Sequence, residues 1–308
     1  MTIFRNYNKA EVSVRNLYKK MYTQQTYGKK IALKKLITYT KELTLDEAVQ
    51  YLNQIIDESD PDVDFEQIYH GYQTSETIRN KYFKDNKLCT DISIKSLFND
   101  EEWKLLPEEQ KQLYNTTIDK LYSSIKDWNW LILIGLIHDL GKVLILKEFY
   151  NLEQHFAVGD IYPLGCSFHK SNIYYDEKWH THNIDFYNRD YNKELGVYKK
   201  NCGFDNIEMT FSHDYYLSNL LYKSTTNLPI EALYIIKYHS FYCWHSPRNN
   251  IRGYEYLASE YDWKMLPLLK LFQKTDLYSK DLELPNIKKI KKYYNNLINK
   301  YIPNKLLF

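Results

Sequence analysis

The feature of the sequence that most restricts the fold is an apolar run, Trp130 to Ile137, that ends directly at His138 and Asp139. A membrane-spanning helix needs about 20 apolar residues, so this run is much too short to cross a bilayer. It is therefore predicted to form a buried helix in a soluble domain. An imidazole and a carboxylate at the end of a buried helix cost free energy unless other groups compensate them. A metal ion would do so, and a buried His–Asp hydrogen bond without a metal is the alternative.

Three other segments place a possible metal ligand near the end of an apolar stretch. His213 is followed by Asp214 in a second His–Asp pair, His239 closes the segment ALYIIKYH, and Asp276 follows the segment LLKLFQKT. Together with the His138 segment, they predict a metal site between packed helices.

The remaining histidines outside these segments carry weaker signals. His180 and His182 could chelate a metal if the chain is extended there, but their polar neighbourhood favours a surface loop. We assign structural roles to His155, His169 and His245.

Few residues interrupt helices in this chain. Only 9 Gly and 8 Pro occur among 308 residues, which favours long helices over many short strands. Apolar residues recur with helical spacing from Leu113 to Ile125 and again from Ile287 to Tyr301, where most lysines fall on the opposite face. Residues 155–205 are predicted to form long loops that could include a short strand pair. No linker-like change in composition occurs, so we expect one mostly α-helical domain over residues 1–308.

Charge and cysteine content argue against several classes of protein. The 41 Lys and Arg nearly balance the 39 Asp and Glu, which argues against a dedicated nucleic-acid-binding protein. The four cysteines form no C-x-x-C pair and are too few for a disulfide framework. The first residues lack the apolar core of a signal peptide. We therefore expect a cytoplasmic protein that acts without a membrane or a nucleic acid.

Several motifs resemble those of a known family. The pattern of His70, His138-Asp139 and Asp276 matches the H…HD…D signature of the HD-domain superfamily. Eight blocks, in the same order, further resemble the myo-inositol oxygenase family: FRNY (4–7), DESDPDVDF (57–65), HGYQT (70–74), GLIHDLGKVL (135–144), VGDIYPLGC (158–166), HDYY (213–216), YHSFYCWH (238–245) and TDLYSK (275–280). Generic HD phosphohydrolases share only the sparse metal signature, so the resemblance is specific.

The resemblance implies an HD-domain helical bundle that acts as a non-haem di-iron oxygenase in inositol catabolism. Such an enzyme uses O₂ to cleave myo-inositol between C1 and C6, which gives D-glucuronate. Its two iron ions are mixed-valent, Fe(II)/Fe(III), in the active form. Carried over to this chain, the ligands of one iron would be His70, His138, Asp139 and Asp276, and those of the other His213, His239 and the bridging Asp139.

The same resemblance implies roles in catalysis and substrate binding. Asp139 and Lys142 are the predicted catalytic residues. Lys142 lies about one helical turn after Asp139, so its ammonium can point at an oxygen bound to the same metals. The predicted substrate contacts are Arg5, Asp57, Glu58, Ser59, Lys142, Gly159, Asp160, His239 and Ser240.

One departure from the family pattern lies between His70 and His138, which are separated by more residues than the family has there. We interpret the extra stretch, about residues 81–126, as an insertion outside the core, either a solvent-facing addition or a regulatory or partner-binding element. The family is usually monomeric, and a monomer is also the expectation for this chain.

Two other functions agree with the metal pattern. An HD phosphohydrolase would use the same metals to activate water against a phosphate ester, and its pocket would need several Arg or Lys side chains near the metals. A non-catalytic metal-binding regulator would show broken ligands, and none is broken here. The inositol-cleaving oxygenase is therefore the leading hypothesis.

Overall fold

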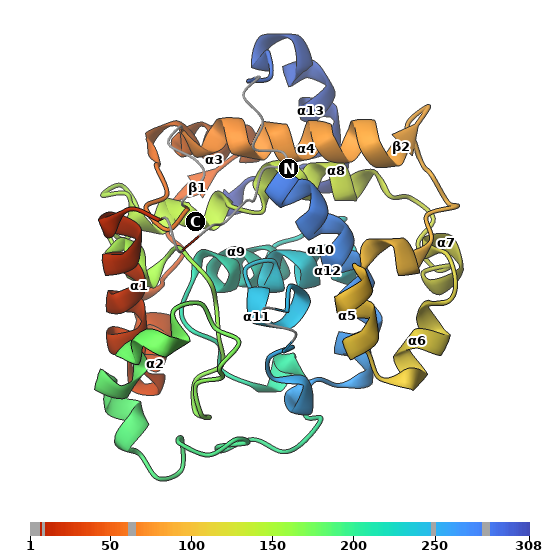
Figure 1. The fold of residues 1–308 in the computed structure, drawn as a ribbon. Helices are drawn as coiled ribbons and strands as arrows, with labels where there is room; N and C mark the ends of the chain where they lie inside the picture. Colours follow the sequence, from red (N-terminus) through yellow and green to blue (C-terminus); the bar gives the residue numbers. More distant parts are fainter. Residues whose placement is uncertain (1–6, 8–9, 61–65, 248–250, 279–283) are drawn as a thin grey trace.

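The computed structural model describes residues 7, 10–60, 66–247, 251–278 and 284–308. Within these residues the protein is mostly α-helical, as predicted, and its strands form only two short pairs. Five helices lie around the centre of the molecule (Figure 1): α4 (Gln67–Tyr82), α8 (Asn129–Ile137), α9 (His213–Lys223), α10 (Ile230–Tyr238) and α12 (Glu260–Tyr278).

The other α-helices surround this central group. In Figure 1, α1 and α2 lie on one side of the molecule and α5 to α7 on the opposite side. Their bounds are α1 (Val12–Gln24), α2 (Tyr27–Leu36), α3 (Leu45–Gln50), α5 (Asp100–Leu105), α6 (Glu108–Tyr114), α7 (Ile118–Leu121), α11 (Tyr242–His245) and α13 (Ile287–Tyr301). Short 3₁₀ helices connect them: η2 (Tyr51–Gln54), η3 (Ile94–Leu97), η4 (Leu140–Ile145), η5 (Gln154–Phe156), η6 (Tyr175–Glu177), η7 (Trp179–His182), η8 (Ile184–Tyr187), η9 (Phe204–Asn206) and η10 (Glu255–Leu257).

The helix α8 occupies the middle of the fold because its surface is apolar on every side. All residues from Trp130 to Ile137 are buried, and the helix contacts α4, α10 and α13. A helix without a polar face is stable only when other elements surround it. The prediction of a buried helix that ends at His138 is confirmed.

Two glycines allow α4 and α8 to approach each other closely. A Cβ atom at Gly71 would lie 2.6 Å from the carbonyl oxygen of Leu136, and a Cβ atom at Gly135 would lie 2.9 Å from Ser75 Cα. Larger side chains at these positions would push the helices apart. The close contact places His70, which precedes Gly71, beside the end of α8.

The two strand pairs are antiparallel and lie away from the loops of residues 155–205. β1 (Glu42–Leu43) pairs with β4 (Leu306–Leu307), and β2 (Phe83–Lys84) pairs with β3 (Lys87–Leu88). Residues 155–205 form loops and 3₁₀ turns, as predicted, but their only strand-like contact is an isolated bridge from Pro163 to Met209. The prediction that a short strand pair could lie within these loops is therefore wrong.

The single helix predicted for Leu113–Ile125 is wrong, because the chain forms two short helices, α6 and α7, in this region. Between them, the backbone of residues 116–118 pairs with that of residues 92–94: Ile94 N–H donates to Thr116 O at 3.0 Å and Ile118 N–H donates to Ile92 O at 3.0 Å. Asn and Thr have low helix propensity, and here the pairing with another segment replaces the helical hydrogen bonds.

Residues 81–126 pack against α12. The hydroxyls of Tyr114 and Tyr122 donate to the carbonyl oxygens of Trp263 and Lys264, and both tyrosines are buried. Apolar side chains of this segment belong to the same buried cluster as the rest of the protein. The segment is therefore more than a solvent-facing addition, although it supplies no residue of the metal centre described below.

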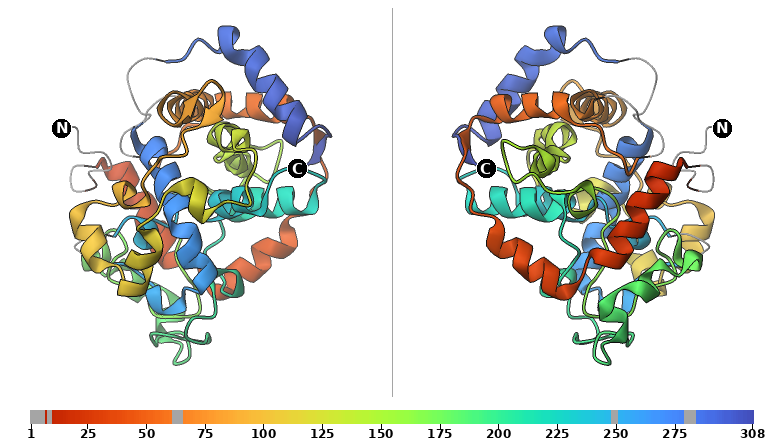
Figure 2. Two further views of the ribbon diagram at one scale, coloured as in Figure 1. Left: turned by 90° about the vertical axis from the view of Figure 1, so that its right-hand side faces the viewer. Right: turned by 90° about the vertical axis from the view of Figure 1, so that its left-hand side faces the viewer.

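The C-terminal helix α13 has the amphipathic character predicted from its spacing. Tyr294, Leu297, Ile298 and Tyr301 are buried, and most of its lysines are exposed. Figure 2 shows α13 on the outside of the molecule, beside α8. Among the helices that the structure describes, none has the length and apolar character that crossing a membrane requires.

Candidate metal centre

The six predicted ligands come together in the centre of the molecule, and we call this cluster the metal centre. All six side chains are buried: His70 on α4, His138 and Asp139 at the end of α8, His213 at the start of α9, His239 directly after α10, and Asp276 on α12. The described residues contain two groups that could each hold a metal ion, His70 with His138 and Asp139, and His213 with His239 and Asp139.

The start of α9 is fixed next to η4. Ser212 caps the helix, since its Oγ accepts a hydrogen bond from Tyr215 N–H at 3.3 Å. A Cβ atom at Gly141 would lie only 2.2 Å from the carbonyl oxygen of His213. Glycine at this position therefore lets the first turn of α9 contact η4, which holds His213 close to Asp139.

Asp139 lies between two pairs of histidines. Its Oδ2 atom is 3.7 Å from His70 Nε2 and 3.5 Å from His138 Nε2. Its Oδ1 atom is 3.2 Å from His213 Nε2 and 3.6 Å from His239 Nε2. Each carboxylate oxygen thus faces one histidine pair, which is the arrangement that a bridging ligand needs.

Asp276 adds a second carboxylate on one side only. Its Oδ1 atom lies 2.9 Å from His70 Nε2 and 3.3 Å from His138 Nε2. Its Oδ2 atom accepts a hydrogen bond from Tyr242 Oη at 3.4 Å. The side with His70 and His138 therefore has four of the predicted ligands, counting Asp139, and the side with His213 and His239 has three.

Backbone carbonyls orient three of the four imidazoles. His138 donates its Nδ1 hydrogen to Gly135 O at 2.9 Å. In the same way, His213 donates to Ala157 O at 2.6 Å and His239 donates to Ile236 O at 2.9 Å. A neutral imidazole that donates from Nδ1 presents an unprotonated Nε2 atom to the centre, which is the form that binds a metal. His70 Nδ1 is buried and has no hydrogen-bond partner among the described residues.

The distance between two of these nitrogens tests whether a metal fits. His213 Nε2 and His239 Nε2 are 3.2 Å apart. Both Nδ1 atoms already carry the hydrogen, so two lone pairs face each other in a buried site. A cation between them would remove this repulsion. Imidazole and carboxylate ligands together suit iron, whereas thiolate ligands would favour zinc or an iron–sulfur cluster. The residues therefore fit a metal centre.

The two carboxylates of the metal centre are anionic. Burial favours their neutral form, but the positive charge of Lys142 holds the pKa of Asp139 well below its usual value. Polar contacts with the imidazoles of His138 and His70 likewise outweigh burial and hold the pKa of Asp276 well below its usual value. Both side chains are thus ready to bind a cation.

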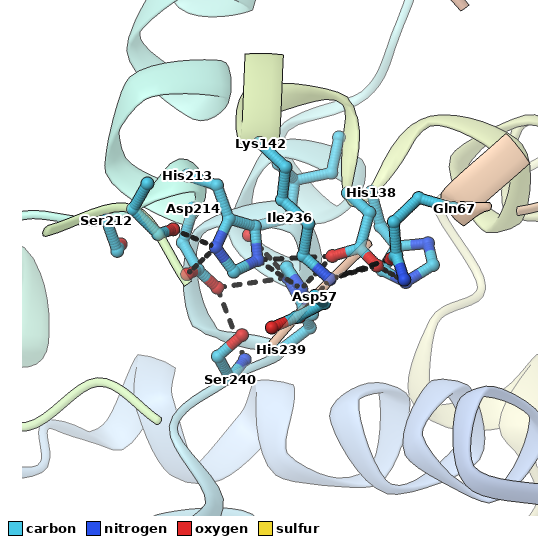
Figure 3. Close-up of polar contacts among 12 residues, drawn as sticks. Asp57, Gln67, His138, Lys142, Ser212, His213, Asp214, Ile236, His239 and Ser240 are labelled. Atoms are coloured by element: carbon cyan, nitrogen blue, oxygen red, sulfur yellow. Dashed lines mark hydrogen bonds and ion pairs between the residues drawn. The ribbon is translucent and has the colours of Figure 1, made fainter. Parts of the chain in front are cut away.

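Asp214 lies directly behind two of the histidines (Figure 3). Its side chain is fully buried, with Oδ1 3.1 Å from His239 Nδ1 and Oδ2 3.5 Å from His213 Nδ1. Its Oδ1 also accepts the Ser240 N–H at 3.2 Å. A carboxylate at this place helps to fix the orientation of both imidazoles. The sequence showed the His213-Asp214 pair, but no role for Asp214 could be derived from it.

Lys142 connects the metal centre to the neighbouring polar residues (Figure 3). Its Nζ donates to Asp139 Oδ2 at 2.7 Å, to Asp57 Oδ2 at 2.7 Å and to Gln67 Oε1 at 2.9 Å. Burial alone would lower the pKa of Lys142, but the two carboxylates raise it above its usual value. Lys142 in turn keeps the pKa of Asp57 low despite burial. The sequence did not indicate Gln67, which comes close only because α4 begins beside η4.

A cavity of about 370 Å³, including space open to solvent, adjoins the metal centre. Of the predicted substrate contacts, those that line this cavity are Asp57, Ser59, Lys142, Gly159, His239 and Ser240. Tyr242 and Asp60 line it as well and were not predicted.

Two predicted contacts, Glu58 and Asp160, do not line this cavity. The Glu58 side chain is exposed and is not part of the cavity lining. Asp160 is buried, and its Oδ1 accepts a hydrogen bond from Tyr18 Oη at 2.8 Å. Arg5 lies outside the described residues.

The other histidines lie outside the metal centre. His155 and His245 are buried, and His169 hydrogen-bonds Ser171 Oγ at 2.7 Å. The expectation of a surface loop is wrong for His180, which is buried against the rings of Phe168 and Tyr175, and right for the exposed His182. Aromatic side chains brought from other turns of the loop cover His180, and the local sequence does not reveal them.

Comparison with known proteins agrees with the geometry of the centre. The family model described as myo-inositol oxygenase matches residues 11–100 and 106–308. An inositol oxygenase of Dictyostelium discoideum is 40% identical over 307 residues, which cover 98% of this chain and 89% of that protein. Inositol oxygenase 2 of Arabidopsis thaliana is 37% identical over 98% of this chain and 82% of its own length, and the Homo sapiens inositol oxygenase is 35% identical over 97% and 89%. This chain therefore belongs to the myo-inositol oxygenase family.

Proposed function

We propose that this protein is a di-iron oxygenase that cleaves the C1–C6 bond of myo-inositol with O₂ and releases D-glucuronate. The reaction removes four electrons from the ring, and these electrons reduce one O₂, with a net gain of one oxygen atom in the product and release of one water. Membership of the family supports the reaction. The structural observation that carries the proposal is the carboxylate of Asp139, whose two oxygens face two different histidine pairs.

Two iron ions would occupy the metal centre, one on each side of Asp139. His70, His138 and Asp276 would complete the first site, and His213 and His239 the second. When bound, a mixed-valent Fe(II)/Fe(III) pair supplies the redox chemistry with O₂. Since the second site has fewer protein ligands, we assign the substrate to that side.

The cavity suits a neutral polyol. Such a ligand needs many hydrogen bonds at fixed positions, because each buried polar group without a partner costs about 1–3 kcal/mol. Asp57, Ser59 and Ser240 supply carboxylate and hydroxyl groups around the cavity, and Lys142 supplies a cationic donor. A hydroxyl oxygen of the substrate would replace one of the three present acceptors of Lys142, whose positive charge stabilises negative charge on that oxygen.

The charges around the cavity argue against a phosphohydrolase. Among the described lining residues, Lys142 is the only lysine or arginine, and two carboxylates already bind it. With Asp139 and Asp276 engaged in holding the metals, a phosphate ester would still meet Asp57 and Asp60, and Lys142 is the one side-chain cation among the described lining residues that could compensate it.

Oxygen consumption tests the proposal. Iron-loaded protein is expected to take up O₂ only when myo-inositol is added, and to form D-glucuronate in equal amount. Release of phosphate from phosphate esters without O₂ uptake would instead assign the metals to hydrolysis. A cytoplasmic monomer that acts without nucleic acid or membrane stays a prediction.

A further inference from the structure

A second cavity lies between α2, α9 and α10, and we call it the lysine cavity. It holds about 460 Å³, including space open to solvent, and shares no lining residue with the cavity of the metal centre. The lining residues that matter here are Lys30, Lys34, Lys237, Asp205, Glu208 and Tyr215. Three lysine side chains around one cavity are stable in their charged form only where nearby negative charges compensate them.

Two of the three lysines have a carboxylate partner. Lys34 Nζ lies 2.8 Å from Glu208 Oε1, and Lys237 Nζ lies 2.5 Å from Asp205 Oδ1. Both pairs are partly exposed at the edge of the cavity. Each carboxylate is therefore already matched by one ammonium group.

Lys30 has no such partner. Its side chain is only 1% exposed, and no described carboxylate lies within ion-pair distance of it. Its Nζ donates to Thr210 O at 3.2 Å and lies 3.6 Å from the centre of the Tyr215 ring. A buried ammonium group without an anion costs free energy that one carbonyl oxygen and one aromatic ring compensate only in part.

The surroundings of Lys30 affect its pKa. Burial, with Lys34 and Lys237 acting in the same direction, lowers the pKa of Lys30 well below its usual value, although Glu208 and Asp214 oppose the change. An anion bound beside Lys30 would favour the charged form of this amine, and Lys34 and Lys237 lie close enough to the same cavity to donate further hydrogen bonds.

We propose that the lysine cavity is a binding site for a phosphate group, with Lys30 as its central donor and Lys34 and Lys237 at its entrance. A tetrahedral oxyanion has several acceptor oxygens, which matches three separate ammonium groups better than a planar carboxylate does. This site is distinct from the metal centre and does not depend on the iron chemistry proposed above.

The neighbouring surface indicates what could be attached to the phosphate. A larger cavity, of about 920 Å³ including open space, shares Asp205, Tyr215 and Lys237 with the lysine cavity. Tyr222 and Tyr261 also line it. Aromatic rings beside an anion site favour a phosphate ester with a flat or apolar group over free phosphate.

Binding and thermal stability of the full-length, iron-loaded protein test the proposal. Inorganic phosphate is expected to bind once per chain by calorimetry and to raise Tm, and phenyl phosphate is expected to bind more tightly. Lys30→Met should weaken phosphate binding at least about tenfold and abolish the rise in Tm, whereas Lys30→Arg should keep part of both. Lys35→Met, on the exposed face of the same helix, should change neither.

The Lys30→Met variant is also expected to fold, because an apolar side chain of similar length replaces a buried unpaired amine. Its Tm without phosphate should equal or exceed that of the wild type. Equal phosphate affinity in wild type and Lys30→Met would overturn the site, as would a wild type that does not bind phosphate in the millimolar range. Acetate binding as tightly as phosphate would overturn the choice of ligand.

Discussion

Asp139 connects the two halves of the metal centre through one side chain. Its Oδ2 atom faces His70 and His138, and its Oδ1 atom faces His213 and His239. A residue with this position contributes to both sites at once, which no other predicted ligand does. Each remaining ligand belongs to one side only.

Asp139→Ala is therefore expected to lose both iron ions, because each site loses a ligand and the pair loses its bridge. Elemental analysis of the purified variant after reconstitution with iron checks this result. Asp190→Ala, at an exposed aspartate, serves as the control and should keep the iron content of the wild type. Retention of two irons by Asp139→Ala would exclude the bridging role.

Lys142→Met should keep its iron and lose most of its activity. The ammonium group donates to Asp57 and Asp139 beside the cavity but is not a predicted metal ligand. Loss of one preorganised donor typically lowers turnover by about 10²–10³-fold, and we expect kcat/KM for myo-inositol to fall by a similar factor. Steady-state O₂ uptake measures it, with the exposed Lys147→Met as control. Wild-type kinetics in Lys142→Met would refute the role.

His180 is expected to make folding stability depend on pH. Burial lowers the pKa of its imidazole below the ordinary value of 6.5, and its Nδ1 has no hydrogen-bond partner among the described residues. The unfolded chain therefore binds a proton at a higher pH than the folded chain does. The contribution of His180 to stability is complete above pH 6.5 and is lost as the pH falls through its lowered pKa.

Tm measured between neutral and mildly acidic pH checks this expectation. The slope of Tm against pH should be smaller in His180→Phe, which keeps an aromatic ring against Phe168 and Tyr175. His182→Phe, at an exposed histidine two residues away, should leave the slope unchanged. Identical slopes in all three proteins would contradict the assignment.

The sequence predicted those residues of the metal centre whose neighbours in the chain are themselves unusual. His138 and Asp139 could be recognised because they follow an apolar run, where a buried polar group costs free energy unless another group compensates it. Asp214 and Gln67 could not be assigned in the same way. Their roles depend on which helices lie next to each other, and no local pattern contains that information.

At the scale of elements, the contact between η4 and α9 determines where His213 lies. Gly141 lies directly against the His213 backbone, and a Cβ atom there would lie 2.2 Å from the carbonyl oxygen. Gly141→Ala should therefore displace the first turn of α9. We expect this variant to lose iron from the His213 side first, which elemental analysis and O₂ uptake would show together. Gly28→Ala, where a Cβ atom meets nothing within 4 Å, is the matched control.

A buried ion pair joins α5 to α12. Glu102 and Lys270 contact each other directly, and both side chains are largely buried. Burial lowers the pKa of Lys270 to about 8, although Glu102 acts in the opposite direction. The pair thus connects residues 81–126 to the helix that carries Asp276, a predicted metal ligand.

Glu102→Gln is expected to lower the free energy of unfolding by about 3–5 kcal/mol, because Lys270 then stays buried without an anion. Chemical denaturation measures the change, and Glu101→Gln at the exposed neighbouring position should have little effect. The double variant Glu102→Leu, Lys270→Met should lose much less than the sum of its single variants. A loss equal to that sum would show that the two groups do not interact.

Periodicity predicted some elements well and others poorly. The fully apolar α8 and the amphipathic α13 each have one dominant signal, and both form as predicted. The regular spacing from Leu113 to Ile125 gave the wrong result, because residues 116–118 bind the backbone of residues 92–94. A competing hydrogen-bond partner from another segment cannot be recognised from spacing alone.

For the molecule as a whole, the described buried apolar residues form one cluster that extends from Tyr7 to Phe308. The single domain over residues 1–308 stays a prediction. Residues 81–126 contribute to the same cluster. Their interpretation as an insertion into the family domain stays a prediction. The mostly helical architecture was predictable because few glycines and prolines interrupt the chain. Which helices pack against each other could not be predicted from the sequence.

The wide separation of the ligands along the chain has a consequence for biosynthesis. A ribosome makes His70, His138 and Asp139 well before it reaches Asp276. The four-ligand side of the centre therefore cannot be complete while the nascent polypeptide is still being translated through α12. If iron occupies this side as proposed, all four ligands become available to it only after α12 has been made, so the site would be filled late in synthesis or after it.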